Sequence, residues 1–248
     1  MSEPWLRPDW PAPSRVRAVS TLRGGGVSVA PYQSFNLAGH VGDDPRAVRT
    51  NRERLLRQAG LPAMPSWLSQ VHGAAVVDAA HAREGCEADG VYTRQAGVVC
   101  AVMTADCLPV LLCERHGRWV AAVHAGWRGL AAGVIESAIA CLATPGGEML
   151  AWLGPAIGPR AFEVGGEVRE VFVARDAAAA EHFTPSPAGR WLMDIYGLAR
   201  RRLAALGVEQ VYGGGWCTVE DGGRFFSYRR DGRTGRMASL VWIEGGGR

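Results

Sequence analysis

Short runs of apolar residues are concentrated in the middle of the chain, between residues 96 and 132. The runs at 97–103, 108–113 and 119–123 are rich in Val, Leu and Ala, and each is bounded by polar or turn-forming residues. Apolar runs of this length, without strict alternation, are typical of strands that are buried on both faces of a sheet. The pattern therefore predicts three strands in succession, followed by an Ala-rich helix.

The rest of the chain predicts a mixture of helices and strands. Asp43, Asp44 and Pro45 are typical of a helix N-terminus, and Gly60 marks the expected end of that helix. Further helices are expected at 130–142, from about residue 168, and at 194–206; further strands at 15–28, 65–80, 148–153 and 208–213; and a hairpin with an arginine-rich loop from residue 217 onward. Because strands and helices alternate without a regular rhythm, we expect an α+β fold of mixed sheets.

Length and composition fit one domain. The chain has 248 residues, of which 48% are hydrophobic, enough to bury a sizeable core. We expect a single domain over residues 1–248, with residues 1–14 as an irregular N-terminal segment. No stretch has the apolar length of a signal peptide or a membrane span, so we expect a cytoplasmic protein without a membrane partner.

Charge and cysteine content exclude two classes of protein. The chain has 27 basic and 24 acidic residues, a net charge of +3, which is too balanced for a nucleic-acid-binding surface. Its six cysteines include no C-x-x-C pair and do not suggest a disulfide framework, so we expect reduced thiols. The sequence does not fix an oligomeric state.

Three strands of the predicted sheets end at, or are interrupted by, residues that can ligate a metal. Cys107 follows the first central run and His124 follows the third, while His72-Gly73 interrupts the strand expected at 65–80. Histidine followed by glycine inside an apolar strand indicates a bulge or a close backbone approach. Taken alone, each residue is explained better as part of the core. Three in neighbouring strands indicate one pocket, either a metal site or a nucleophile with its base.

A set of motifs in a fixed order carries a resemblance to a known family. The most specific are TADCLPVLL at 104–112 and AAVHAGWRGL at 121–130. The others are SFNL at 34–37, NR at 51–52, SQVHG at 69–73, ADG at 88–90, GPAIG at 154–158, FEVG at 162–165 and FFSYRRDGRTGRMAS at 225–239. From about residue 15 to the C-terminus, the chain resembles the YfiH-like family. These proteins were first called polyphenol oxidases or laccase-domain proteins and are described as purine nucleoside phosphorylases with adenosine deaminase activity.

The resemblance implies both a fold and a metal. The fold is a set of mixed sheets flanked by helices, similar to that of a deamidating toxin domain that uses a Cys and His pair. The metal is a zinc ion held by His72, Cys107 and His124, which are also the implied catalytic residues. Three protein ligands leave a fourth position open, as in catalytic zinc sites.

The implied reactions are phosphorolysis of adenosine, inosine and methylthioadenosine, and deamination of adenosine. Both reactions need a proton donor to the purine. The H-x-E motif of zinc nucleobase deaminases occurs at neither His72 nor His124. We therefore expect the donor elsewhere, with Asp106 as the first candidate and Asp89 as the second.

Phosphate and nucleoside should be bound by polar residues near these ligands. The chain has no lysine-containing phosphate loop, so arginine must bind the phosphate. Arg52 is the first candidate, although it and Asn51 fall on the polar surface of the helix at 45–60. The remaining candidates are Arg128, Arg229 and Arg236 for phosphate, and Ser34, Asn36 and Gln70 for ribose hydroxyls or base edges.

Three other interpretations remain open at this point. A metal-free hydrolase would use Cys107 as nucleophile and His124 as base. A multicopper laccase needs on the order of ten histidines, whereas the chain has six and no HxH pair. Copper can still occupy a His–Cys–His site in vitro, which would give a weak polyphenol oxidoreductase activity. The third interpretation is a binding protein without activity.

Overall fold

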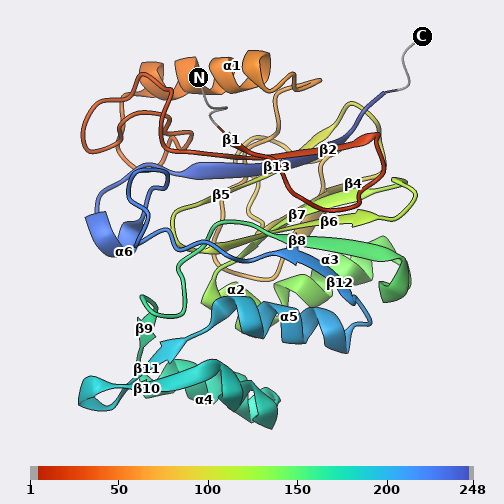
Figure 1. Ribbon diagram of the computed structural model, residues 1–248. Helices are drawn as coiled ribbons and strands as arrows, with labels where there is room; N and C mark the ends of the chain where they lie inside the picture. The colour runs from red at the N-terminus through yellow and green to blue at the C-terminus, as the bar shows by residue number, and fades with distance from the viewer. Residues whose placement is uncertain (1–4, 246–248) are drawn as a thin grey trace.

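Two stacked β-sheets form the centre of the molecule, and helices cover the outer face of each (Figure 1). The computed structural model describes residues 5–245, apart from the side chain of residue 188. One sheet has the order β1 (Trp5–Leu6), β2 (Val16–Thr21), β13 (Met237–Ile243), β5 (Val99–Thr104). The other has the order β12 (Gln210–Gly213), β8 (Met149–Leu153), β6 (Leu108–Glu114), β7 (Val120–Ala125), β4 (Gly90–Thr93), β3 (Val76–Asp78).

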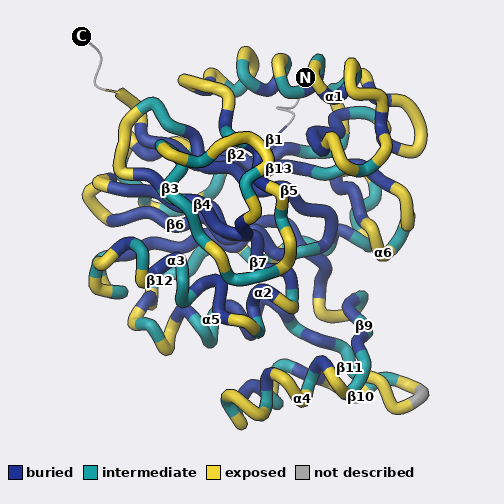
Figure 2. Tube along the Cα trace, turned by 180° about the vertical axis from the view of Figure 1, so that it is seen from behind, coloured by how far each residue is buried: buried dark blue, intermediate teal, exposed yellow. Residues whose placement is uncertain are grey.

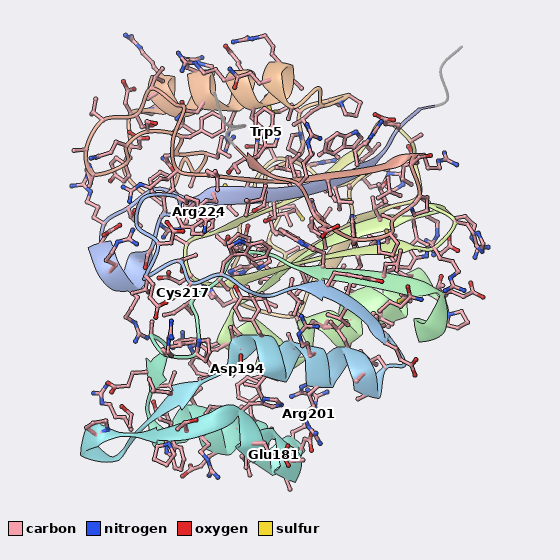
Figure 3. The ribbon with its side chains drawn as sticks, viewed as in Figure 1. Trp5, Glu181, Asp194, Arg201, Cys217 and Arg224 are labelled. Carbon is pink, nitrogen blue, oxygen red and sulfur yellow. The ribbon has the colours of Figure 1, made fainter. Side chains whose placement is uncertain are left out.

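The helices form the two outer layers. Helix α1 (Pro45–Gln58) lies over the first sheet, and α2 (Trp127–Ala132), α3 (Val134–Leu142) and α5 (Ile195–Ala205) lie under the second (Figure 1). Figure 3 labels Asp194, whose side chain accepts a hydrogen bond of 3.0 Å from the N–H of Gly197 and so caps α5. No helix of the described residues is long and apolar enough to cross a membrane.

A small lobe projects from the lower end of the molecule in Figure 1. It contains α4 (Gly166–Arg175) and a three-stranded sheet in the order β10 (Phe183–Ser186), β11 (Arg190–Met193), β9 (Glu163–Val164). The remaining short elements are α6 (Tyr228–Asp231) and three 3₁₀ turns at Gly146–Glu148, Ala177–His182 and Pro187–Gly189.

Every residue of β5, β6 and β7 is buried, as the continuous apolar runs predict. One cluster of apolar side chains fills the space between the two sheets, including Val102, Leu111 and Trp152. Separate clusters lie beneath α1 and between the second sheet and its helices. Figure 2 shows the resulting buried centre and the exposed outer turns of α1 and α4. The expected mixed sheets flanked by helices are therefore confirmed.

Helix α1 has the predicted start. The Asp44 side chain accepts a hydrogen bond of 2.8 Å from the N–H of Arg46, and Pro45 is the first helical residue. The predicted strand at 148–153 and the helix at 194–206 are also confirmed, within one residue at most boundaries.

Four predictions of local structure are wrong. The helix expected at 130–142 begins at Trp127 and breaks at Gly133, whose φ of 96° ends α2. The strand expected at 65–80 is mostly loop, with only β3 in it. The C-terminal hairpin does not form, because β13 pairs with β2 and β5 instead of with a local partner. The segment 1–14, expected to be irregular, contains a short strand, because Trp5 and Leu6 pair with β2; residues 1–4 lie outside the described part. In addition, no pattern in the sequence predicted the lobe sheet.

Asn51 is fully buried, which corrects its predicted place on the helix surface. Its Nδ2 donates to Ser28 Oγ and to the carbonyls of Ser34 and Asn36, at 2.8 to 3.1 Å. Its Oδ1 accepts from the N–H of Val27 at 2.9 Å. One amide thus satisfies four groups of the loop between β2 and α1, because this loop has no regular backbone pairing of its own.

We expect Asn51→Ala to lower the free energy of unfolding by about 3 kcal/mol, because it removes four hydrogen bonds and leaves the carbonyl of buried Asn36 without its partner. Urea denaturation monitored by circular dichroism measures the change. Arg49→Ala, on the exposed face of the same helix, is the control and should change the stability by less than about 0.5 kcal/mol. Equal effects of the two substitutions would show that the buried amide is not what holds the loop.

Candidate metal centre

His72, Cys107 and His124 come together at the ends of two central strands, β6 and β7, of the second sheet. Cys107 directly precedes β6, and His124 is the residue of β7 that pairs with Pro109 of β6. His72 lies in the loop before β3, with a φ of 61°. The three ligand atoms lie within 4.8 Å of one another, and His72 Nε2 is 3.8 Å from Cys107 Sγ. The two imidazole rings meet edge to face, with their centroids 4.8 Å apart.

Asp89 holds two of these residues in place. Its carboxylate is fully buried and accepts hydrogen bonds from the consecutive backbone N–H groups of Val71, His72 and Gly73, at 2.7 to 3.2 Å. The same carboxylate accepts from His124 Nδ1 at 2.7 Å. Because a carboxylate is only an acceptor, this bond fixes Nδ1 as the protonated nitrogen and leaves Nε2 free.

Two glycines allow the three ligands to approach one another. A Cβ on Gly126 would lie 3.0 Å from both Cys107 Sγ and His72 Cδ2. A Cβ on Gly129 would lie 2.8 Å from the carbonyl oxygen of Gly73. Side chains at these two positions would push the His72 loop away from the sheet, so glycine is needed at both.

The site favours charge separation between the thiol and an imidazole. Burial alone would raise the pKa of Cys107, but the positive charges of His124 and His72 and their hydrogen bonds lower it to about 6. Burial would lower the pKa of His124, but the Cys107 thiolate and the Asp89 carboxylate raise it to about 9. Without a metal, the pair is therefore a thiolate beside an imidazolium near neutral pH.

The donor set suits a metal ion such as zinc. It combines one thiolate with two imidazole nitrogens, and His124 has the carboxylate partner that usually orients a ligating histidine. The Cys107–His72 separation is close to the sulfur–nitrogen distance of a tetrahedral zinc site, about 3.6 Å from the usual bond lengths. His72, Cys107 and His124 could hold the ion and leave further positions open.

Two hollows open on either side of the three residues. The first, the Arg236 hollow, has a volume of about 360 Å³ and is lined by His40, Gln70, His72, Met103, Thr104, Ala105, Cys107, His124, Tyr228 and Arg236. The second, the Trp127 hollow, has a volume of about 270 Å³ and is lined by His72, Ala105, Asp106, Cys107, Trp127, Arg128, Ile157, Phe162, Ile195, Tyr228 and Arg229. Cys107 and His72 border both, so a ligand at the metal centre can extend into either.

Asp106 has a structural role in addition to any chemical one. Its Oδ1 accepts from the hydroxyl of Thr218 at 2.5 Å, and its Oδ2 accepts from the N–H of Arg229 at 2.7 Å. Its carbonyl accepts from the N–H of Ile157, and its φ is 89°. Asp106 thereby connects the metal centre to the C-terminal turns, and its role as proton donor stays a prediction.

Gln70 lines the Arg236 hollow and Arg128 lines the Trp127 hollow, and their roles in binding substrate stay predictions. The Gln70 amide exchanges two hydrogen bonds, of 2.8 and 2.7 Å, with the backbone of Met103. It therefore fastens the His72 loop to the outer edge of β5. The Arg128 guanidinium lies 4.5 Å from the centre of the Trp127 ring, in the other hollow.

Ser34, Asn36 and Arg52 line neither hollow. Ser34 Oγ accepts from the N–H of Gly26, and Asn36 Oδ1 accepts from the N–H of Arg236 at 2.9 Å. Arg52 donates to the carbonyl of Leu37, pairs with Glu84 and lies over the Trp67 ring. Their substrate-binding roles stay predictions, and the structure gives Ser34 and Asn36 a part in shaping the loop behind Arg236.

The sequence analysis missed His40 and Tyr228, which line the Arg236 hollow. His40 follows Gly39 in an irregular polar loop, and Tyr228 stands in the arginine-rich C-terminal stretch. A histidine beside glycine in such a loop is a weak signal for a site residue, and Tyr228, the first residue of α6, has no comparable signal. Long-range contacts, not local pattern, bring these two to the metal centre.

The fold and site define a class of mixed α/β protein in which an antiparallel sheet and a mixed sheet are stacked, and a His–Cys–His group lies at the ends of two central strands of the mixed sheet. The family model described as "Multi-copper polyphenol oxidoreductase laccase" matches residues 17–244. The chain therefore belongs to this laccase-domain, YfiH-like family.

Relatives and solved structures agree with this assignment. A protein of Pseudomonas aeruginosa named purine nucleoside phosphorylase is 60% identical over 97% of this chain and 98% of its own length. Purine nucleoside phosphorylase YfiH of Escherichia coli is 55% identical over 95% of this chain and 97% of its own. A crystal structure of a Neisseria meningitidis protein has a TM-score of 0.94 and 52% identity, covering 98% of this chain and 100% of that one. YlmD of Geobacillus stearothermophilus has a TM-score of 0.89 and 30% identity, covering 99% and 98%.

We expect Gly126→Ala to weaken zinc binding about 10- to 100-fold, the range found when groups that orient metal ligands are altered. Its φ of −60° suits alanine, so the fold should persist and the new Cβ should act only on the ligands. Competition with a zinc-binding dye measures the affinity. Gly166→Ala, at the start of α4 with no atom within 4 Å of the added Cβ, is the control. Unchanged zinc affinity in Gly126→Ala would contradict the geometry of the site.

We expect the metal-free protein to be alkylated at Cys107 by iodoacetamide with a midpoint near pH 6. Only the thiolate reacts, so the rate should rise as the pH increases through the pKa of Cys107, about 6. Peptide mass spectrometry against pH measures the rate, and bound zinc should suppress it. Cys113, whose pKa burial raises to about 12, should stay unmodified. A midpoint of pH 8 or above would show that the histidines do not stabilise the thiolate.

Proposed function

We propose that this protein is a zinc-dependent purine nucleoside phosphorylase that acts on adenosine, inosine and methylthioadenosine and also deaminates adenosine. The observation that carries the proposal is the placement of three metal-binding side chains and a half-buried arginine, Arg236, on one hollow. The names of relatives that share 60% and 55% of their residues with this chain support the reaction. The substrates are then small molecules, a nucleoside and inorganic phosphate.

His72, Cys107 and His124 would hold the zinc. When bound, zinc supplies a Lewis acid beside the substrate. Asp89 holds the proton of the neutral imidazole of His124 on Nδ1, so that Nε2 is the nitrogen available to the ion, and it fixes the loop that carries His72. Copper binds the same donor types, so a copper-loaded protein with weak oxidase activity would be consistent with this site.

Arg236 is the residue best placed to bind phosphate. Its Nη1 donates to the carbonyls of Thr234 and Gly235, and no carboxylate of residues 5–245 forms an ion pair with it. Burial lowers the pKa of this guanidinium, while the nearby Cys107 and Asp106 charges raise it. An arginine with free N–H groups in a hollow is a ready partner for an anion.

His40 completes the polar side of this hollow. Burial and the charges of Arg236 and Arg52 lower its pKa, so the imidazole is neutral at pH 7 and can both donate and accept a hydrogen bond. Arg52 does not line this hollow, so its proposed effect on phosphate binding would be indirect: its positive charge would help to keep His40 neutral. Asp106, which lines the other hollow, remains the proposed donor of the proton to the leaving base.

A phosphate-dependence assay tests the proposal. We expect conversion of inosine to hypoxanthine to require inorganic phosphate, to stop after removal of metal with a strong chelator, and to return with zinc. Cys107→Ala should abolish turnover without a large loss of stability. Liquid chromatography of the products separates hypoxanthine and ribose 1-phosphate from free ribose.

The same assay tests the metal-free hydrolase. A Cys107 nucleophile with His124 as base would stay active or become more active after chelation, because metal release frees the thiolate. Base release that ignores phosphate and survives full removal of metal would overturn the proposed phosphorylase.

A further inference from the structure

Two hollows of different chemistry meet at the metal centre. Cys107, His72, Ala105 and Tyr228 line both, so these residues form the boundary between them. A nucleoside and a phosphate that react with each other must meet at one carbon, with the base and the phosphate on opposite sides of it. The boundary is therefore where the reacting carbon belongs, and each hollow is available for one of the two groups.

The Trp127 hollow has an apolar, aromatic lining. Ile157, Phe162 and Ile195 are each less than 9% exposed and form its buried part, and the partly exposed ring of Trp127 forms a wall. Its one carboxylate, Asp106, already accepts hydrogen bonds on both oxygens. A flat, weakly polar group is the ligand that such a lining accepts best.

The two arginines of this hollow, Arg128 and Arg229, lie against the aromatic rings of its walls. The guanidinium of Arg128 lies over the Trp127 ring at 4.5 Å. That of Arg229 lies 5.5 Å from the Phe162 ring and donates to the carbonyl of Glu163 at 3.0 Å. Arg236 also lies over a ring, that of Tyr228 at 5.9 Å, and no ion pair of these three arginines occurs among the described residues. Arg236 differs in its surroundings, because the residues that share its hollow include the polar side chains of His40, Gln70 and Thr104 instead of a buried apolar wall.

We propose that the Trp127 hollow is the purine-base subsite, that the Arg236 hollow is the phosphate subsite, and that Trp127 stacks on the base. This inference rests on the proposed phosphorylase function and adds the orientation of the substrates to it. The nucleoside enters with its base beside α2 and its ribose over Cys107. The phosphate then approaches the ribose carbon from the side of Arg236 and His40.

The test compares two substitutions with opposite expected effects. Trp127→Ala should raise the KM for inosine about tenfold, the loss expected when a stacked base loses its aromatic partner, and should leave the KM for phosphate within about twofold. Trp127→Phe should restore most of the affinity for inosine. Arg236→Gln should raise the KM for phosphate about tenfold and change that for inosine by no more than about twofold.

Trp191→Ala is the matched control, because Trp191 also lies under an arginine, Arg169 at 4.4 Å, but in the lobe and away from both hollows. It should change neither KM. Zinc content is measured for every variant, because Trp127 follows Gly126, which packs against two of the proposed zinc ligands, and a substitution there could change zinc binding. The reverse pattern, in which Trp127→Ala affects phosphate and Arg236→Gln affects inosine, would overturn the assignment, and so would equal effects of each variant on both substrates.

Calorimetric binding of hypoxanthine to the zinc-loaded protein separates this inference from the proposed function. We expect binding that weakens in Trp127→Ala and persists in Arg236→Gln. If the wild type showed no phosphate-dependent turnover, the proposed function would fail while this measurement still located the base. Hypoxanthine binding that is indifferent to Trp127 and lost in Arg236→Gln would place the base in the other hollow.

Discussion

The site depends on one buried carboxylate, that of Asp89. It accepts hydrogen bonds from three consecutive N–H groups of the His72 loop and from Nδ1 of His124, so two of the three proposed metal ligands are held by the same group. A buried carboxylate with this many donors is stabilised in its charged form, and the pKa of Asp89 is accordingly lowered despite its burial. The geometry of the centre is thus set before any ion binds, which limits the cost of ordering the ligands.

The fold supplies the rigidity that this arrangement needs. His124 lies in β7 and Cys107 directly precedes β6, and both strands are fully buried between two layers of core, whereas His72 lies on a loop. Gln70, Asp89 and the absence of a side chain at Gly129 hold that loop against the sheet. The hydrogen bonds of Gln70 and Asp89 and the close packing at Gly129 therefore act together to fix the position of the loop. The C-terminal turns are attached to the site by the hydrogen bonds that Asp106 accepts from Thr218 and Arg229.

Local sequence patterns predicted the features that depend on neighbouring residues, such as the buried strands and the start of a helix. Continuous apolar runs gave β5 to β7, the Asp44–Pro45 pair gave the start of α1, and the interruptions of the strand pattern gave all three ligands. Two of the misses are long-range: β13 pairs with strands far away in the sequence, and Asn51 is buried by a loop that covers α1. The break of the expected helix at Gly133 is a local miss. Arg236, a lower-ranked phosphate candidate from the sequence, reaches the hollow because β13 lies beside β5. Arg52, favoured from the sequence, packs on Trp67 instead. Residue type and spacing cannot reveal such contacts.

Zinc K-edge X-ray absorption of the purified protein tests the central claim, that His72, Cys107 and His124 form one metal centre. We expect a coordination shell with one sulfur at about 2.3 Å and two imidazole nitrogens at about 2.0 to 2.1 Å, completed by a lighter exchangeable ligand. Asp89→Asn should disorder the imidazole part of this shell while the sulfur distance persists. A zinc shell without sulfur, or one with two sulfurs, would contradict the account.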